Sequence, residues 1–174
     1  MRICVFIILC CVLQAVAQEI KPLTDDEYNL LRKEVVTLPL PVDAVNRADA
    51  LLVEYKGRYT QKQFLRMNYA KSYYLIQSEQ FERAFATLEY CKSLADKINS
   101  PVLSYFYYSY VAGIHGRLEN YELSLEAYLS ALNLAEESED KSTIARSYNN
   151  VGHILIKMGE YIKAKPYIEK FYHY

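Results

Sequence analysis

The sequence predicts an all-α protein built from repeated pairs of helices, and three observations support this prediction. A pattern of small and large residues recurs every forty positions over roughly the last two thirds of the chain. Within each unit the apolar residues recur at helical spacing, so that Tyr121, Leu125 and Leu132 share one face of a single helix. The 174 residues are 52% hydrophobic with only 5 Gly and 5 Pro, which allows a buried core and excludes disordered and collagen-like classes.

The forty-residue period aligns residues of similar size. Two helices approach to about 8–10 Å only where a side chain is short, so recurring small residues predict recurring helix crossings. The aligned sets are small at Ser72, Ala112 and Gly152 and at Ala84, Ser124 and Ala164, and aromatic at Phe81, Tyr121 and Tyr161.

Turn and capping signals divide the chain into helices. Asp140 is a typical N-cap, and Ser100 is suited to cap a helix whose first residue is Pro101. Upstream, the sequence from Thr24 to Glu27 is a capping box that opens a short helix toward Val36. The helices predicted in the repeats span 61–77, 81–97, 101–117, 121–138, 141–158 and 161–173, and residues 42–55, followed by Gly57, resemble the second helix of a degenerate first unit.

These small and aromatic positions, together with the aromatics at Tyr108 and Tyr148, resemble the tetratricopeptide repeat over residues 42–174. The resemblance implies a right-handed helix-turn-helix solenoid of about three and a half repeats. The forty-residue spacing is similar to the extended form of bacterial sensory and regulatory proteins. The chain departs from the family pattern at Asn68, His115 and Phe171, and no proline closes the second helix of a unit.

The first seventeen residues have the organisation of a secretory signal peptide. A basic start at Arg2 precedes eleven apolar residues, and Ala15-Val16-Ala17 offers small residues to a signal peptidase. As a helix, the apolar run spans about 16 Å, roughly half of a bilayer's hydrocarbon core, so a membrane anchor is the weaker interpretation. We therefore expect a periplasmic or extracellular protein without a transmembrane segment in the mature chain. The expected organisation is a signal peptide over 1–17, a capping segment over 18–41 and the repeat array over 42–174.

The resemblance to the tetratricopeptide repeat implies that the first helix of each unit lines a concave side and that this side binds a protein or peptide. The register predicts four permanent cations and no carboxylate on this side, and Arg side chains bind carboxylates in bidentate fashion. The predicted peptide-binding groove, for a partner with acidic character, consists of Arg66, Tyr69, Tyr73, Gln77, Phe106, Ser109, Gly113, Arg117, Arg146, Asn149, His153 and Lys157.

No catalytic, cofactor or metal motif is recognisable. The glycines form no phosphate-binding or dinucleotide loop, and the three histidines lack metal-ligand spacing. A formal net charge of −1 argues against nucleic-acid binding. Cys91 is interpreted as a small buried thiol and His115 as a hydrogen-bonded structural histidine, in preference to a redox role and a ligand or pH-sensing role, respectively.

Three functional hypotheses remain at this point. The first is an exported, non-enzymatic protein that binds a protein or peptide. The second is the extracytoplasmic sensor region of a signalling enzyme such as a diguanylate cyclase, whose membrane and catalytic parts are absent from this chain. The third and weakest is a hydrolase with an unrecognised site.

The last predicted helix carries an apolar stripe of Tyr161, Ala164, Ile168 and Phe171 with no following helix to cover it. Repeat arrays normally end in a helix with a polar outer face. The stripe therefore predicts either self-association through this helix or truncation of a longer product.

We expect the exported protein to begin at Gln18, because signal peptidase cleaves after a small-x-small sequence such as Ala15-Val16-Ala17. Removal of Arg2 changes the formal charge from −1 to −2, and removal of Cys4, Cys10 and Cys11 leaves Cys91 alone. Intact-mass spectrometry of the protein recovered outside the cytoplasm tests this. A mature chain that retains Cys10 would contradict the prediction.

Overall fold

The computed structural model describes residues 20–138 and 140–174, so the predicted signal peptide and its three cysteines lie outside the described residues. Over the described ranges the chain forms eight α-helices and no strand. The helices are α2 (Asp25–Val36), α3 (Pro41–Glu54), α4 (Gln61–Gln77), α5 (Phe81–Ile98), α6 (Pro101–Arg117), α7 (Tyr121–Ser138), α8 (Lys141–Lys157) and α9 (Tyr161–His173).

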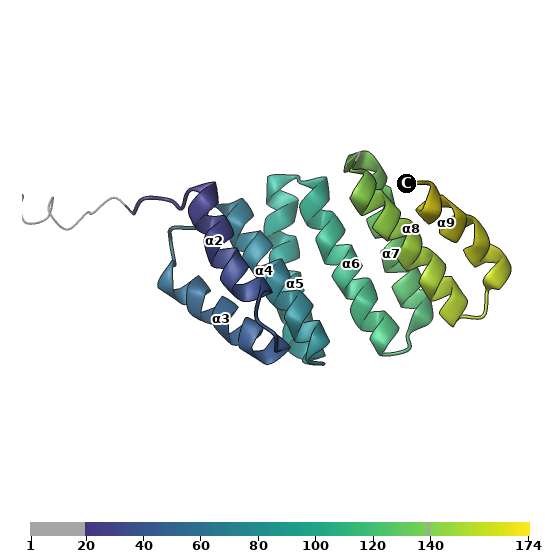
Figure 1. Cartoon of the computed structure of the whole chain (residues 1–174), viewed down its shortest axis with the longest axis horizontal. Helices are drawn as coiled ribbons and strands as arrows, with labels where there is room; N and C mark the ends of the chain where they lie inside the picture. Colours follow the sequence, from purple (N-terminus) through teal and green to yellow (C-terminus); the bar gives the residue numbers. More distant parts are fainter. Residues whose placement is uncertain (1–19, 139) are drawn as a thin grey trace, which may run out of the picture.

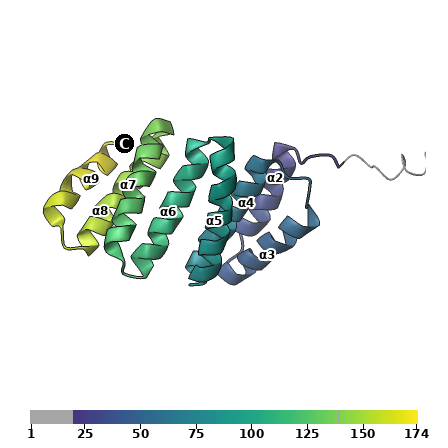
Figure 2. The same cartoon turned by 180° about the vertical axis from the view of Figure 1, so that it is seen from behind.

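Each helix packs mainly against its neighbours in the sequence, and the helix pairs stand side by side in an elongated row (Figure 1; Figure 2 shows the opposite face). The first helices of the last three units begin at Gln61, Pro101 and Lys141, which are forty residues apart. The prediction of an all-α helical repeat solenoid is confirmed, and the predicted helix bounds in the repeats agree within one residue. No helix in the described part of the chain combines the length and the apolar character needed to cross a membrane.

The helix starts follow the predicted capping chemistry, with one exception. In the capping box of α2, the backbone N–H of Glu27 donates to Thr24 Oγ1 at 3.2 Å, and that of Thr24 donates to Glu27 Oε2 at 2.7 Å. Asp140 likewise accepts a hydrogen bond from the backbone N–H of Thr143 at 3.1 Å. Ser100 occupies the N-cap of α6 but makes no side-chain capping bond. The expectation of a side-chain cap at Ser100 was therefore wrong, and the start of α6 relies on Pro101, whose fixed φ suits the first turn.

The aligned small residues lie at helix crossings, as the period predicts. Ser124 is fully buried and its Oγ donates to the carbonyl oxygen of Ala112 at 2.8 Å, so α6 and α7 meet directly at this point. A Cβ added to Gly152 would lie 2.4 Å from Cδ1 of Ile168. That distance is shorter than any normal carbon–carbon contact, so the crossing of α8 and α9 requires glycine unless Ile168 moves.

The core consists of three apolar clusters that follow one another along the row. One joins α2, α3 and α4 around Val35, Leu51 and Met67, and the next joins α4, α5 and α6 around Leu75 and Leu88. A third joins α6 to the last three helices through Tyr105, Leu132, Val151 and Ala164. Each unit thus shares a buried cluster with the next, as in other repeat arrays, where stability comes from nearest-neighbour interfaces.

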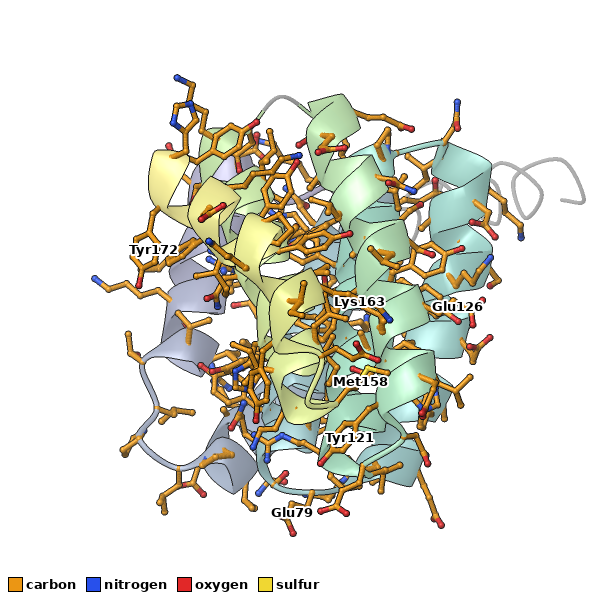
Figure 3. The ribbon with its side chains drawn as sticks, turned by 90° about the vertical axis from the view of Figure 1, so that its right-hand side faces the viewer. Glu79, Tyr121, Glu126, Met158, Lys163 and Tyr172 are labelled. Carbon is orange, nitrogen blue, oxygen red and sulfur yellow. The ribbon has the colours of Figure 1, made fainter. Side chains whose placement is uncertain are left out.

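The predicted apolar stripe of α9 turns out to be largely covered. Ala164 is buried, and Ile168 and Phe171 are half-buried against the preceding helices. The exception is Tyr161, which is 68% exposed. The outer face of α9 carries Ile162, which is 92% exposed, and Tyr172, which Figure 3 shows pointing outward. The stripe packs mainly against α8 of the same unit, and the expected self-association or truncation stays a prediction.

We expect Ala84→Leu to lower the free energy of unfolding by about 1–3 kcal/mol, because Ala84 is fully buried and a larger side chain would overpack the helix crossing. Ala86→Leu is the matched control, since Ala86 lies two positions further along α5 and is exposed, so its effect should stay within about 0.5 kcal/mol. Urea denaturation of both variants measures the difference. Equal effects of the two substitutions would contradict the repeat register.

Candidate functional site

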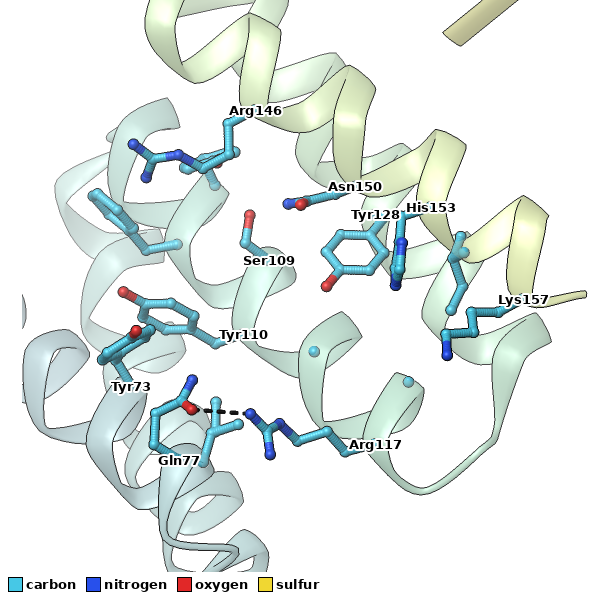
Figure 4. A pocket seen from close by; sticks show the side chains of 16 residues that line it. Tyr73, Gln77, Ser109, Tyr110, Arg117, Tyr128, Arg146, Asn150, His153 and Lys157 are labelled. Atoms are coloured by element: carbon cyan, nitrogen blue, oxygen red, sulfur yellow. Dashed lines mark hydrogen bonds between the residues drawn. The ribbon is translucent and has the colours of Figure 1, made fainter. Parts of the chain in front are cut away.

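A pocket of about 570 Å³ opens between the first helices of the last three units. Its wall comes mainly from the C-terminal halves of α4, α6 and α8, with Tyr128 added from α7 (Figure 4). We call it the concave pocket. Its polar and aromatic lining residues are Tyr73, Gln77, Tyr105, Phe106, Ser109, Tyr110, Arg117, Tyr128, Arg146, Asn150, His153 and Lys157.

The charged groups of the concave pocket are all basic. Arg117 ends α6, Lys157 ends α8, and Arg146 lies in the N-terminal half of α8, while no Asp or Glu lines the pocket. Within the described part of the chain, none of these three cations lies within 4.0 Å of a carboxylate oxygen. The one hydrogen bond drawn in Figure 4 holds Arg117, whose Nη2 donates to Gln77 Oε1 at 3.0 Å.

Aromatic rings form another part of the lining of the concave pocket, and Arg146 lies on the same side as Tyr73 and Tyr110 (Figure 4). The rings of Tyr73 and Tyr110 lie 6.4 Å apart, and those of Phe106 and Tyr110 lie 6.1 Å apart. Burial raises the pKa of Tyr110 to about 12 and raises the pKa of Tyr128 as well, so both phenols are neutral at physiological pH. The pocket therefore combines fixed positive charges with neutral rings that offer apolar contact.

A second pocket of about 460 Å³ lies at the other end of the same helices, and we call it the N-terminal pocket. It shares Phe106 and Tyr110 with the concave pocket, so the two are adjacent. Its lining comes from α2, α4, α6 and α8 and includes Ser100 and Asp140, which immediately precede α6 and α8. Its charged residues are Arg32 from α2, Lys62 and Arg66 from α4, and Asp140 at the start of α8.

The structure brings most of the predicted groove residues into these two pockets. Arg66 and Tyr69 line the N-terminal pocket and Phe106 lines both, while Asn149 is exposed and lines neither. Tyr69 is only 2% exposed, and its buried hydroxyl has no hydrogen-bond partner among the described residues. The remaining predicted residues line the concave pocket, namely Tyr73, Gln77, Ser109, Gly113, Arg117, Arg146, His153 and Lys157.

Sequence reasoning missed several lining residues for identifiable reasons. Asn150, and not Asn149, lines the concave pocket. Asn149 follows Arg146 by three residues and Asn150 by four, and residues at either spacing lie on the same helix face as Arg146. Tyr110 follows Phe106 by four residues, so the same rule could have found it. Arg32 was missed because its segment was treated as a cap on the array rather than as part of the concave wall.

The two isolated reactive side chains are structural. Cys91 is fully buried, and burial raises the pKa of its thiol to about 12, which confirms the interpretation as a small buried thiol. The ring of His115 packs edge-on against Phe85 at 5.5 Å. Its buried Nδ1 has no hydrogen-bond partner among the described residues, so the expected hydrogen bond is not found at this nitrogen. At the repeat position where the family pattern has a large apolar residue, the His115 ring makes an aromatic contact with Phe85.

Comparison with known families agrees with the geometry. Residues 106–172, which include most of α6 and continue almost to the end of α9, match the family described as tetratricopeptide repeat. No curated protein matches the chain. The match covers less than half of the chain, and with the stacked helix pairs it shows that this part of the chain is similar to tetratricopeptide repeats, a generally non-catalytic protein-interaction fold.

Proposed function

We propose that the chain is a binding module whose concave pocket accepts an acidic segment of a partner protein or peptide. One observation carries this proposal. Arg117, Arg146 and Lys157 converge on one pocket from two helices, without a carboxylate among the lining residues, in a chain whose formal net charge is −1. A ligand carboxylate would supply the opposite charge that the pocket itself lacks.

The chemistry of the lining fits a peptide better than a lone ion. Arginine forms paired hydrogen bonds with carboxylates, and tyrosine offers a large apolar surface at a low entropic cost. The amide of Asn150 adds a polar group able to bond a peptide backbone.

Helix electrostatics offers a simpler explanation for part of this pattern. A cation at the C-terminal end of a helix is stabilised by the helix dipole, and Arg117 and Lys157 are the last residues of their helices. Arg146 is six residues into α8, where the dipole provides no such reason. The convergence of all three side chains on one aromatic pocket favours ligand binding over dipole compensation alone.

We further propose that this binding takes place outside the cytoplasm. The support is the signal-like organisation of residues 1–17, and the cleavage expected before Gln18 tests it separately from the binding itself.

We expect Arg117→Glu combined with Arg146→Glu to weaken binding of acidic peptides at least tenfold, since each substitution replaces attraction by repulsion. Peptides selected from a random library on the parent protein provide the ligands, and they should be enriched in Asp and Glu. Isothermal titration calorimetry measures affinity at low and high salt, where screening should weaken the parent's binding.

The control is Lys163→Glu combined with Lys165→Glu, which changes the net charge equally on exposed positions of α9, outside both pockets. It should leave the affinity within about twofold of the parent, and circular dichroism should show all variants folded. If the pocket variant binds the selected peptides as tightly as the control does, the concave pocket is not the binding site.

A further inference from the structure

We infer that the N-terminal pocket is a second anion-binding subsite, so that one extended ligand with two acidic positions runs along the first helices and occupies both pockets. This inference rests on the proposed function and deepens it, because it specifies the spacing and direction of the ligand. The evidence is the lining of the N-terminal pocket, its place on the helices and its connection to the concave pocket.

The N-terminal pocket has an excess of positive charge. Arg32, Lys62 and Arg66 line it, and none of them lies within 4.0 Å of a carboxylate oxygen of a described residue. The one carboxylate of the lining, Asp140, is already engaged, because it accepts hydrogen bonds from the backbone N–H and hydroxyl of Thr143. Hydrogen bonding to Thr143 lowers the pKa of Asp140, so this carboxylate is ionised and offsets one of the three positive charges of the pocket.

Lys62 lies at the opposite end of its helix from Arg117 and Lys157, whereas Arg66 has the same register position in α4 that Arg146 has in α8. Lys62 is the second residue of α4, and the pocket also includes Ser100 and Asp140, which immediately precede α6 and α8. The positive ends of the α4 and α6 dipoles therefore meet near this pocket, while the Asp140 carboxylate at the N-cap of α8 offsets the positive end of that helix. Dipole compensation would favour acidic residues here, so it does not account for Lys62 and Arg66. In the N-terminal pocket the positive helix N-termini add to the positive potential of the side chains. In the concave pocket the negative helix C-termini oppose that potential.

The two pockets form a continuous path. Phe106 and Tyr110 line both, so a ligand that passes from one to the other crosses these two rings. On α4 the path runs from Arg66 to Gln77, and eleven residues of helix rise by about 16 Å. An extended peptide covers this distance with about five residues. The structure thus fits a ligand with acidic residues about five positions apart and an apolar side chain between them.

The test uses synthetic peptides with acetylated N-termini and amidated C-termini, so that side chains carry all the negative charge. One peptide has two Glu pairs placed five positions apart with a Leu between them. A second has the same composition but places the pairs one residue apart, and a third has a single Glu pair. Isothermal titration calorimetry with the full protein at low salt measures their affinities.

We expect the five-residue spacing to bind about tenfold more tightly than the short spacing, because only the longer peptide reaches both pockets. Lys62→Gln combined with Arg66→Gln should remove this advantage while the short-spaced and single-pair peptides still bind in the concave pocket. Thermal unfolding provides the folding control, since Arg66 also lies over the ring of Tyr28 at 5.6 Å. Lys62→Gln alone avoids that contact and should remove part of the advantage.

The outcomes separate the inference from the proposed function. If Arg117→Gln with Arg146→Gln weakens binding but Lys62→Gln with Arg66→Gln leaves the spacing preference unchanged, the N-terminal pocket is not a subsite and the proposed function stands. Equal affinity of the two spacings in the parent protein also overturns the inference alone. Absence of binding by every peptide up to about 1 mM overturns both.

Discussion

The close approach of helices at small residues is the constraint on which the rest of this structure depends. Gly152 shows it most clearly, since its missing side chain leaves the space that Ile168 fills. Ser124 shows a polar version, in which a buried hydroxyl bonds the backbone of the neighbouring helix. The small residue at each crossing determines how closely the two helices approach. Because the same positions are small in successive units, successive helix pairs pack with similar geometry.

The forty-residue period converts this packing rule into a functional surface. Residues forty positions apart occupy equivalent places on successive first helices, so Gln77, Arg117 and Lys157 all reach the same end of the concave pocket. Arg66, Phe106 and Arg146 are equivalent in the same way and line the two pockets. The helix pairs thus gather basic residues that are far apart in the sequence onto one side of a chain with no net positive charge.

The fold could be predicted closely from the sequence because its determinants are local and repeated. Capping residues, helical periodicity and small residues each recur at fixed spacing, and most helix bounds follow from them. The site could be predicted only in part. The repeat register predicts which face of a helix lines the pocket, but it does not distinguish Asn149 from Asn150, because these neighbours lie at the edge of that face. Only Asn150 lines the concave pocket. The contribution of Arg32 depends on how far α2 reaches toward the other first helices, which is a tertiary property that no local pattern encodes.

The central claim is that the helix pairs build a positive concave face before any ligand binds. The most direct measurement is the reaction rate of a cysteine placed there by Asn150→Cys, with the other cysteines replaced, toward an anionic and a cationic disulfide reagent. Relative to Ala86→Cys on the exposed side of α5, the ratio of anionic to cationic rates should be about tenfold higher at low salt. The ratio at Asn150→Cys should fall in about 1 M salt, where the Debye length is about 3 Å. The ratio should also fall when Arg117→Gln and Arg146→Gln are introduced together. Equal ratios at the two positions, or a preference that survives removal of both arginines, would contradict the account.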